Sequence, residues 1–263
     1  MKVLNNKAIV VGLEKINLDD FPNLEVIGCN MTSCEHLPLE EMKRRGIKVI
    51  SLKDYPEFLK SITSTAEHTI GLIIALLRKY KEVINTPTYL LGERDEYLGH
   101  TLFGKTLGII GYGRVGKQVD AVAKALGMEV ITFDRYEGLA HIFYVGSLEQ
   151  VLAESDIVSI HIPLEGNEGF LTKEHLKRMK STAYLINTSR NGVIEKGVLL
   201  DSLQNKIIAG AAIDFIDDPE LMEYSKRNNN LILTSHLGGN TFEDRQRTEN
   251  FIIERVNNHL NML

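Results

Sequence analysis

Alternation of short apolar runs and amphipathic stretches predicts strands and helices in turn along the first part of the chain. β-Branched runs of strand length lie at residues 7–12, 24–28 and 47–51, and a helical pattern at residues 38–46 ends at Gly46. Strands that alternate with helices are typical of a parallel sheet. We therefore expect the chain to begin with a small α/β lobe.

A long helix and then a break are the next features of the pattern. Residues 64–85 begin with Ser64 or Thr65 as a cap and are apolar nearly all round, which predicts a helix buried between two lobes. Pro87 interrupts this pattern, and residues 92–105 are polar and contain glycines, which indicates a crossover segment. The sequence therefore predicts a second lobe after this segment.

Six strand-like runs with helical patterns between them make up the second lobe. The strand-like runs lie at residues 106–111, 128–134, 156–162, 183–189, 207–214 and 231–236. The helical patterns lie at residues 113–127, 147–155, 172–180 and 195–205. Six strands with interposed helices predict one doubly wound parallel sheet, the Rossmann type of α/β fold.

The tail of the chain predicts a return to the first lobe. Residues 241–263 form a helical pattern with one apolar face. The residues of that face are Phe251, Ile252, Val256 and Leu260. We expect this face to pack on the first lobe, so that residues 1–88 and 240–263 form a smaller, flavodoxin-like α/β domain and residues 89–239 form the doubly wound domain.

Charge and composition narrow the classes of partner. The net charge is −5 and no long run of one sign occurs, which argues against a nucleic-acid-binding surface. The longest apolar segment, residues 70–77, is far shorter than a membrane span, and the N-terminal residues lack the pattern of a secretion signal. Cys29 and Cys34 are the only cysteines, and no His/Cys cluster with zinc-like spacing surrounds them. We therefore expect a cytoplasmic protein with reduced thiols and without a nucleic-acid partner, a membrane partner or a metal site.

Three glycines predict a dinucleotide site. Gly111, Gly113 and Gly116 form G-x-G-x-x-G between a strand-like run and a helical pattern. Glycines in that position allow a tight turn, a close approach of pyrophosphate to the backbone, and close packing of helix on strand. The next strand ends at Asp134, whose carboxylate suits the ribose hydroxyls of NAD and repels the 2′-phosphate of NADP. NAD is the expected cofactor, although the neighbouring Arg135 is a possible partner for a phosphate.

Polar side chains follow several of the later strand-like runs, at the edge where ligands of open α/β sheets bind. Arg190, Asp214 and His236 each come at such a strand end, and Asp217 and Asp218 lie in the acidic turn after Asp214. Reduction of a 2-keto acid needs a cation for the carboxylate, a proton donor for the carbonyl oxygen and an anion that supports the donor. Arg190, His236 and either Asp217 or Asp218 fit these roles in that order.

Several motifs, in order along the chain, resemble the D-isomer-specific 2-hydroxyacid dehydrogenase family. The motifs are AEHTIGLIIALLR at residues 66–78, LGIIGYGRVGKQV at 107–119, HIPL at 161–164, INTSRNGVIE at 186–195, AGAAID at 209–214 and TSHLGGNT at 234–241. This resemblance implies an NAD-dependent oxidoreductase that interconverts a small 2-keto acid and a D-2-hydroxy acid by direct hydride transfer. It also implies a homodimer paired through the cofactor domain, and it makes the smaller lobe the substrate domain.

The same resemblance implies roles for individual residues. Arg190 would bind the substrate carboxylate and polarise the carbonyl, and His236 would act as general acid in reduction and general base in oxidation. Asp218 stands before Pro219, where the family usually has a glutamate, and would support that histidine. The residues that would bind the cofactor are Gly111, Gly113, Arg114, Val115, Gly116, Asp134, Pro163, Thr188, Asp214 and Gly239.

Three departures from the family pattern bear on activity. The acidic turn is one residue shorter and carries Asp218 rather than glutamate, which weakens the expected support of His236. We also expect a shortened substrate lobe, and GCNMTSCEH at residues 28–36 replaces a glycine-rich loop that usually meets the substrate carboxylate. The expected substrate contacts in this loop are Asn30, Met31 and Thr32. These departures leave a second hypothesis open, which is a catalytically weak NAD(H)-binding sensor or corepressor-like protein of the same fold.

Overall fold

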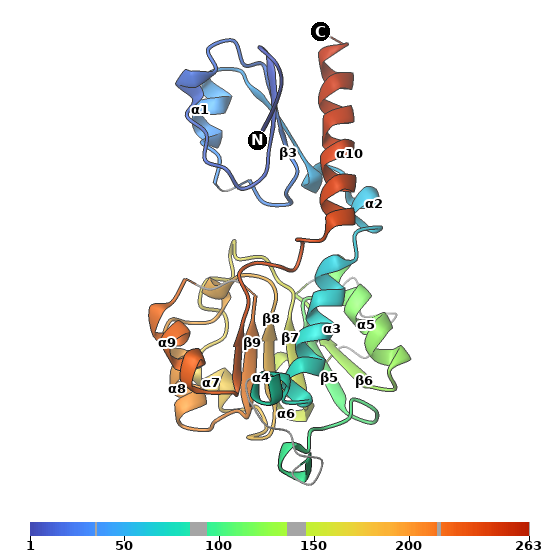
Figure 1. Cartoon of the computed structure of the whole chain (residues 1–263), viewed down its shortest axis with the longest axis vertical. Coiled ribbons are helices and arrows are strands. Elements are labelled where there is room, and N and C mark those ends of the chain that lie inside the picture. Colours follow the sequence, from blue (N-terminus) through green and yellow to red (C-terminus); the bar gives the residue numbers. More distant parts are fainter. Residues whose placement is uncertain (35, 85–93, 136–145, 215–216, 263) are drawn as a thin grey trace. The chain divides into compact units, whose positions relative to one another are not determined.

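Figure 1 shows a computed structural model of the chain, which describes residues 1–34, 36–84, 94–135, 146–214 and 217–262. The chain forms two compact units: unit 1 comprises Met1–Ile62 and Asn240–Leu263, and unit 2 comprises Thr63–Gly239. The first boundary lies at residue 62, whereas the sequence pattern predicts residue 88. The reason is that the helix beginning at Ser64 buries its apolar side chains against the sheet of unit 2.

Unit 1 is a four-stranded sheet with helices on both faces. Its strands are β1 (Lys2–Asn5), β2 (Ala8–Val11), β3 (Val26–Cys29) and β4 (Lys48–Ser51), and they lie in that order. Strands β2 to β4 are parallel, and β1 pairs with β2 antiparallel. Its helices are α1 (Leu39–Arg44), α2 (Pro56–Leu59) and α10 (Phe242–Leu260), with 3₁₀ turns η1 (Leu18–Asp20) and η2 (Leu52–Asp54). The edge strand β1 is too short and too polar for the sequence pattern to predict it.

Helix α10 packs on the sheet of unit 1, as the apolar face of the tail predicts. Ile252 and Val256 are fully buried in a cluster with Val10 of β2 and with side chains of α2. A Cβ atom at Gly28 in β3 would lie 2.5 Å from Ile252 Cγ2 and 2.8 Å from Val256 Cγ2. Only glycine at this position lets the helix approach the strand so closely.

Unit 2 is a six-stranded parallel sheet in the order β10-β9-β8-β7-β5-β6. Its strands are β5 (Thr106–Ile110), β6 (Glu129–Phe133), β7 (Ile157–Ile160), β8 (Tyr184–Asn187), β9 (Gly210–Ile213) and β10 (Leu231–Leu233). Its helices are α3 (Ser64–Leu77), α4 (Tyr80–Ile84), α5 (Arg114–Ala125), α6 (Leu148–Glu154), α7 (Lys173–Leu176), α8 (Val198–Gln204) and α9 (Pro219–Arg227), with 3₁₀ turns η3 (Arg94–Tyr97) and η5 (Asn191–Val193).

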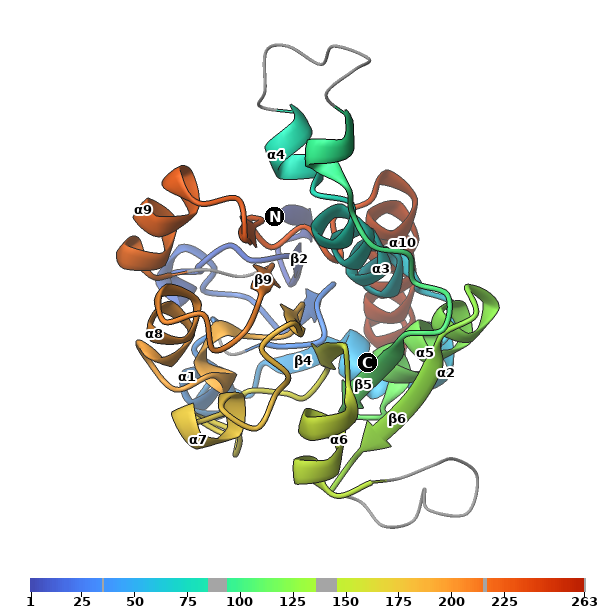
Figure 2. The ribbon, with the colours of Figure 1, turned by 90° about the horizontal axis from the view of Figure 1, so that it is seen from below.

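The two faces of this sheet carry different helices (Figure 2). Helices α3 and α5 cover one face, where Ile73 and Val119 are fully buried with strand side chains. Helices α6 to α9 cover the other face, where Leu152, Leu176 and Leu221 share a second core. The predicted doubly wound parallel sheet and the prediction of a second, smaller α/β unit are confirmed.

The predicted helix over residues 64–85 is interrupted, which corrects the sequence pattern. Lys79 has φ of +54°, a left-handed conformation that ends α3 and turns the chain into α4. The turn brings the Lys81 ammonium to within 3.0 Å of the Asn228 carbonyl oxygen and 2.7 Å of the Leu231 carbonyl oxygen. Hydrogen bonds from a cation to these carbonyls hold α4 in its place after the turn.

Helix α9 is absent from the sequence prediction, although its boundaries carry ordinary signals. The Asp218 side chain caps its N-terminus, and Pro219 occupies its first turn. Lys226 and Arg227 lie in the last turn, where cations stabilise the helix dipole. These signals identify the helix once the acidic turn is interpreted as a cap.

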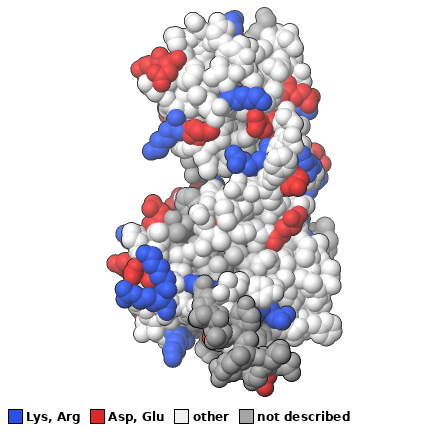
Figure 3. Space-filling model, in the orientation of Figure 1, with Lys and Arg blue, Asp and Glu red and all other residues white. Residues whose placement is uncertain are grey.

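Charged side chains of both signs are interspersed on the face drawn in Figure 3. Blue and red groups lie close together on both units, and neither unit shows a broad field of one sign on this face within the described residues. The mixed charge pattern of the sequence predicts such a surface. Within the same residues, none of the helices combines the length and the apolar character needed to cross a bilayer.

Candidate active site

The glycine loop connects β5 to α5. Gly111 has φ of +93°, and a Cβ atom there would lie 2.7 Å from the His161 carbonyl oxygen. A Cβ atom at Gly116 would lie 2.2 Å from the Gly111 carbonyl oxygen. Nothing lies within 4 Å of the Cβ position at Gly113. Two of the glycines are therefore required by packing, and the third leaves space in front of the backbone.

The start of α5 and the end of β6 have the features of a dinucleotide site. Gly113 is the N-cap of α5 and provides no side-chain hydrogen bond to the first turn, so the positive end of the helix is available to an anion. Asp134 follows β6, and its Oδ2 accepts a hydrogen bond of 2.7 Å from the Tyr112 N–H. This bond holds the carboxylate beside the loop, where it suits a ribose. The residues present therefore fit NAD.

Other predicted cofactor residues lie around this loop. Arg114 and Val115 form the first turn of α5, and Val115 packs on the core shared with α3. Pro163 follows β7, and its carbonyl oxygen accepts a hydrogen bond of 2.9 Å from Asn167 Nδ2. Arg135 lies over the Phe170 ring at 5.3 Å and donates to the Gly166 carbonyl oxygen.

Arg190 lies in a turn that a buried amide holds in place. Asn187, the last residue of β8, is 1% exposed, and its Nδ2 donates to the Arg190 carbonyl oxygen at 2.9 Å. Asn187 Oδ1 accepts from the Ser189 N–H at 2.9 Å, and Arg190 Nη1 donates to the Ser189 carbonyl oxygen at 2.9 Å. The turn therefore places a half-buried guanidinium at the carboxyl edge of the sheet.

Asp214 follows β9 as a buried carboxylate, 1% exposed, that accepts several hydrogen bonds. Oδ1 accepts from Thr234 Oγ1 at 2.5 Å and from the Leu237 N–H at 2.8 Å, and Oδ2 accepts from the Gly238 N–H at 2.7 Å. Burial raises the pKa of Asp214, but hydrogen bonds from His68, Thr234, Leu237 and Gly238 outweigh it and hold the pKa below that of an ordinary aspartate. The carboxylate is therefore ionised at neutral pH.

His236 follows β10 and lies next to Asp214 and Arg190. Its φ is +59°, and its N–H donates to the Asp214 backbone carbonyl at 2.7 Å. Burial and the positive charge of Arg190 lower the pKa of His236, whereas the negative charge of Asp214 raises it, and the net pKa lies below that of an ordinary histidine. The imidazole of His236 thus lies at the same edge of the sheet as Asp214 and Arg190, and the charges of both groups influence its pKa.

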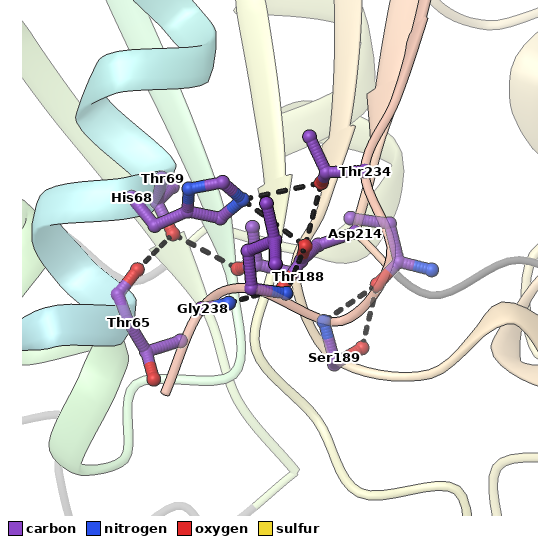
Figure 4. A network of polar contacts seen from close by, with 10 residues as sticks. Thr65, His68, Thr69, Thr188, Ser189, Asp214, Thr234 and Gly238 are labelled. Carbon is purple, nitrogen blue, oxygen red and sulfur yellow. Dashed lines mark hydrogen bonds and ion pairs between the residues drawn. The ribbon is translucent and has the colours of Figure 1, made fainter. Parts of the chain in front are cut away.

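His68 of α3 belongs to the same network, and the sequence reasoning missed it (Figure 4). Its Nε2 lies 3.1 Å from Asp214 Oδ1 and 3.2 Å from Thr234 Oγ1. The neighbouring Thr69 Oγ1 lies 2.9 Å from Oγ1 of Thr188, one of the predicted cofactor residues. The signal in the sequence was the AEHTIG motif itself, in which three polar residues precede the apolar part of the helix.

Asp218 has a different contact from the one expected. Its Oδ1 accepts from the backbone N–H groups of Glu220 and Leu221 at 3.0 and 3.1 Å, which makes it the N-cap of α9. The carboxylate that raises the pKa of His236 is that of Asp214. Support of His236 by Asp218 stays a prediction.

The three predicted substrate residues lie in unit 1, directly after β3. Asn30 donates its N–H to the Val11 carbonyl oxygen at 3.0 Å, and its buried Oδ1 has no hydrogen-bond partner in the described part of the chain. Met31 packs against the core on the α1 side of the sheet, and Thr32 is exposed. In unit 2, nothing lies within 4 Å of the Cβ position at Gly239. Across the residues the structure describes, no three His, Cys, Asp or Glu side chains are arranged to hold a metal ion.

Comparison with known proteins places these features in a family. Residues 70–238 match the model of the D-isomer specific 2-hydroxyacid dehydrogenase family, NAD binding domain. The chain is 32% identical over 262 residues to the glyoxylate reductase of Pyrococcus furiosus, a match that covers 93% of this chain and 76% of that protein. It is 32% identical over 244 residues to the D-3-phosphoglycerate dehydrogenase of Bacillus subtilis, a match that covers 89% of this chain but only 45% of that protein. The chain thus spans less than half the length of the second relative.

A solved structure agrees with the sequence matches. The crystal structure of D-lactate dehydrogenase from Aquifex aeolicus, complexed with NAD and lactic acid, matches 97% of this chain and 83% of its own, with 26% identity and a TM-score of 0.76. The family model covers more than half of the chain, and NAD as the cofactor is confirmed by the domain that it describes. The chain belongs to the D-isomer specific 2-hydroxyacid dehydrogenase family.

Proposed function

We propose that the protein interconverts a small 2-keto acid and its D-2-hydroxy acid with NAD. The observation that carries this proposal is the placement of Arg190 after β8 and of His236 after β10, the two strands that flank β9 in the parallel sheet. Both groups therefore follow strands at the same edge of the sheet, and the charge of the guanidinium lowers the pKa of the imidazole, which supports a shared small substrate. NAD in the glycine loop would supply or accept the hydride at the second carbon of that substrate.

Arg190 binds the substrate carboxylate in this proposal. A guanidinium presents two parallel N–H groups to a carboxylate, which orients the acid as well as attracting it. The buried Asn187 amide donates a hydrogen bond to the Arg190 carbonyl oxygen. This bond fixes the backbone position from which the guanidinium extends. Neutralisation of Arg190 by the carboxylate also removes one of the two causes that lower the pKa of His236.

His236 donates a proton to the carbonyl oxygen in reduction and removes it from the hydroxyl in oxidation. Asp214 favours the imidazolium, and burial opposes it. Because reduction needs the protonated imidazole, kcat/KM for reduction is expected to fall with rising pH, and to do so at a lower pH than for an ordinary histidine. Oxidation needs the neutral imidazole, so its kcat/KM is expected to rise across the same range.

Asn30, Met31 and Thr32 of unit 1 are the proposed contacts for the rest of the substrate. The buried oxygen of Asn30, which has no hydrogen-bond donor among the described residues, supports this role. A buried acceptor without a donor costs about 1–3 kcal/mol, and a substrate hydroxyl would relieve this cost. We also propose that unit 2 forms a homodimer. Leu98 and Phe103 of its crossover segment are 69% and 75% exposed, and large apolar side chains of this kind favour an interface.

The test is turnover by the purified full-length chain with NADH and a panel of glyoxylate, pyruvate, hydroxypyruvate and phosphohydroxypyruvate. Loss of the absorbance of reduced nicotinamide with at least one acid is the expected result, and chiral analysis is expected to find the D-product. NADH binding, measured by fluorescence, provides the control for a folded cofactor site. Tight NADH binding without turnover of any acid in the panel would contradict the proposal.

A second candidate function is a catalytically weak NAD(H)-binding sensor. The N-cap role of Asp218 favours it, because a carboxylate occupied by two backbone N–H groups is less available to His236. His236→Ala separates the two functions in cells. Loss of the cellular function with NADH binding intact supports the enzyme, and full retention supports the sensor.

A further inference from the structure

Figure 4 shows His68 in a network with Thr234, Asp214 and Gly238. Asp214 in turn accepts the backbone N–H of His236. The chain enters unit 2 at Thr63, and α3 begins one residue later, so His68 lies in the second turn of that helix. The chain leaves unit 2 after Gly239, directly after the segment that carries His236. Asp214 lies between these two segments and contacts both.

The hydrogen bonds determine which atom of His68 carries a proton. The ionised Asp214 carboxylate can only accept, so His68 Nε2 at 3.1 Å from Oδ1 must be a donor. The Thr234 hydroxyl donates its hydrogen to the same Oδ1 at 2.5 Å, which leaves its oxygen free to accept from His68 Nε2 at 3.2 Å. All three groups are satisfied only when the Nε2–H points at Asp214 and Thr234.

Asp214 also binds the backbone of the segment that carries His236. The Asp214 carbonyl accepts the N–H of His236 at 2.7 Å, and its carboxylate accepts the next two N–H groups, of Leu237 and Gly238. A Cβ atom at Gly238 would lie 2.9 Å from Asp214 Oδ2, so glycine is needed for this close approach. One aspartate therefore accepts the N–H groups of three consecutive residues. These bonds fix the backbone position from which the His236 side chain extends.

We propose that His68 is a positioning residue for the reaction: its Nε2–H orients the Asp214 carboxylate, which fixes the backbone that carries His236. This inference rests on the proposed function for its kinetic consequence. His68 itself touches neither the reacting atoms nor the cofactor in this proposal. Its neighbour Thr69 makes a parallel contact to Thr188 at the end of β8, so α3 is joined to two strand ends by adjacent side chains.

The experiment compares His68→Leu, which keeps similar bulk without a donor, with His68→Gln, which retains an N–H donor. His68→Leu is expected to lower kcat about 10- to 100-fold, the size of effect that a small misplacement of a catalytic group causes, with KM and NADH affinity unchanged. His68→Gln is expected to recover most of kcat. Glu67→Gln, one residue earlier on the exposed side of α3, is the matched control and is expected to match the unsubstituted protein.

A second measurement needs no turnover. NMR titration of the His236 imidazole in the free protein is expected to give a lower pKa in His68→Leu, because a less fixed Asp214 raises that pKa less. If His68→Leu does not fold, His68→Asn provides the comparison, since its shorter amide does not span the distance to Asp214. A folded variant of either kind with unchanged kcat and an unchanged His236 titration would overturn the proposal. Absence of turnover in the unsubstituted protein would overturn the proposed function instead, and the titration would still decide the role of His68.

Discussion

Asp214 at the end of β9 in unit 2 is a buried carboxylate with four donors, whereas Asn30 after β3 in unit 1 buries an oxygen that accepts no hydrogen bond within the described residues. Both residues follow an interior strand that pairs in parallel with both of its neighbours, in a sheet with helices on both faces. The carboxyl edge of unit 2 is thus preorganised by its own side chains, and that of unit 1 retains an unsatisfied acceptor. Preorganised groups suit catalysis, and unsatisfied groups suit recognition of a ligand.

The largest expected effect tests the preorganised edge directly. His236→Asn keeps a polar side chain but removes the acid and base, so kcat is expected to fall by about 10²–10⁴. NADH affinity is expected to stay unchanged, because the glycine loop is intact. His100→Asn, an exposed histidine of the same unit, is the control. Full activity of His236→Asn in steady-state assays would contradict the conclusion that the carboxyl edge of unit 2 carries the catalytic groups.

Two glycines that bring a helix close to a sheet allow a matched comparison of the units. Gly116→Ala places a Cβ 2.2 Å from a backbone oxygen, and Gly28→Ala places one 2.5 Å from the Ile252 side chain. Both are expected to lower the free energy of unfolding by about 1–3 kcal/mol, with Gly116→Ala the larger effect because backbone moves less readily than a side chain. Gly71→Ala, with nothing within 4 Å, is the control.

The same two variants separate stability from cofactor binding. Gly116→Ala is expected to weaken NADH binding as well as stability, and Gly28→Ala only stability. Denaturant unfolding and NADH titration measure the two quantities. Equal NADH affinity in the two variants would contradict the assignment of the glycine loop to the cofactor.

Asp214→Asn tests the contribution of the buried carboxylate to stability. The folded pKa of Asp214 lies below its unfolded value, so its hydrogen bonds stabilise the fold above the unfolded carboxyl pKa, and this stability is lost as pH falls through the folded pKa. The variant is expected to lose about 1–3 kcal/mol at neutral pH, because an amide cannot accept from all four donors. The difference from the unsubstituted protein is expected to shrink in acid. A difference that does not vary with pH would show that charge is not the cause.

The smallest expected effect concerns the thiols of unit 1. A hydrogen bond from Cys29 lowers the pKa of the Cys34 thiol, burial raises it, and Ser51 lowers it, so that the net pKa is below the ordinary value. The pKa of Cys29, which is fully buried, is raised. Iodoacetamide is therefore expected to modify Cys34 first at neutral pH, and Cys29→Ala, which removes the donor, is expected to slow this reaction. Mass spectrometry of the modified peptide measures the order, and modification of Cys29 first would contradict it.

Fold prediction from the sequence was most complete where apolar periodicity is strong. The six strands of unit 2 and the helix that returns to unit 1 have long apolar patterns, and tertiary packing preserved them. The break after α3 depends on Lys81 and carbonyls about 145 residues later in the chain, which local patterns do not contain. Helix α9 was missed because Asp218 was interpreted as chemistry rather than as a cap.

The candidate site shows the same division. The glycine loop, Arg190 and His236 follow strands, and strand ends can be located from sequence alone. His68 reaches Asp214 across 146 positions of the chain, so only the fold shows that an apolar helix contributes a polar side chain there. The roles of Asn30, Met31 and Thr32 depend on substrate, and these stay predictions.

The left-handed backbone of His236 has a consequence for how this protein tolerates change. A histidine with φ of +59° stores conformational strain of roughly 1–2 kcal/mol that a glycine would not. Replacement of the imidazole by hydrogen would therefore relax the backbone while abolishing any proton transfer. A histidine at this position therefore lowers the stability of the fold relative to a glycine, and the segment that carries the imidazole is not optimised for stability alone.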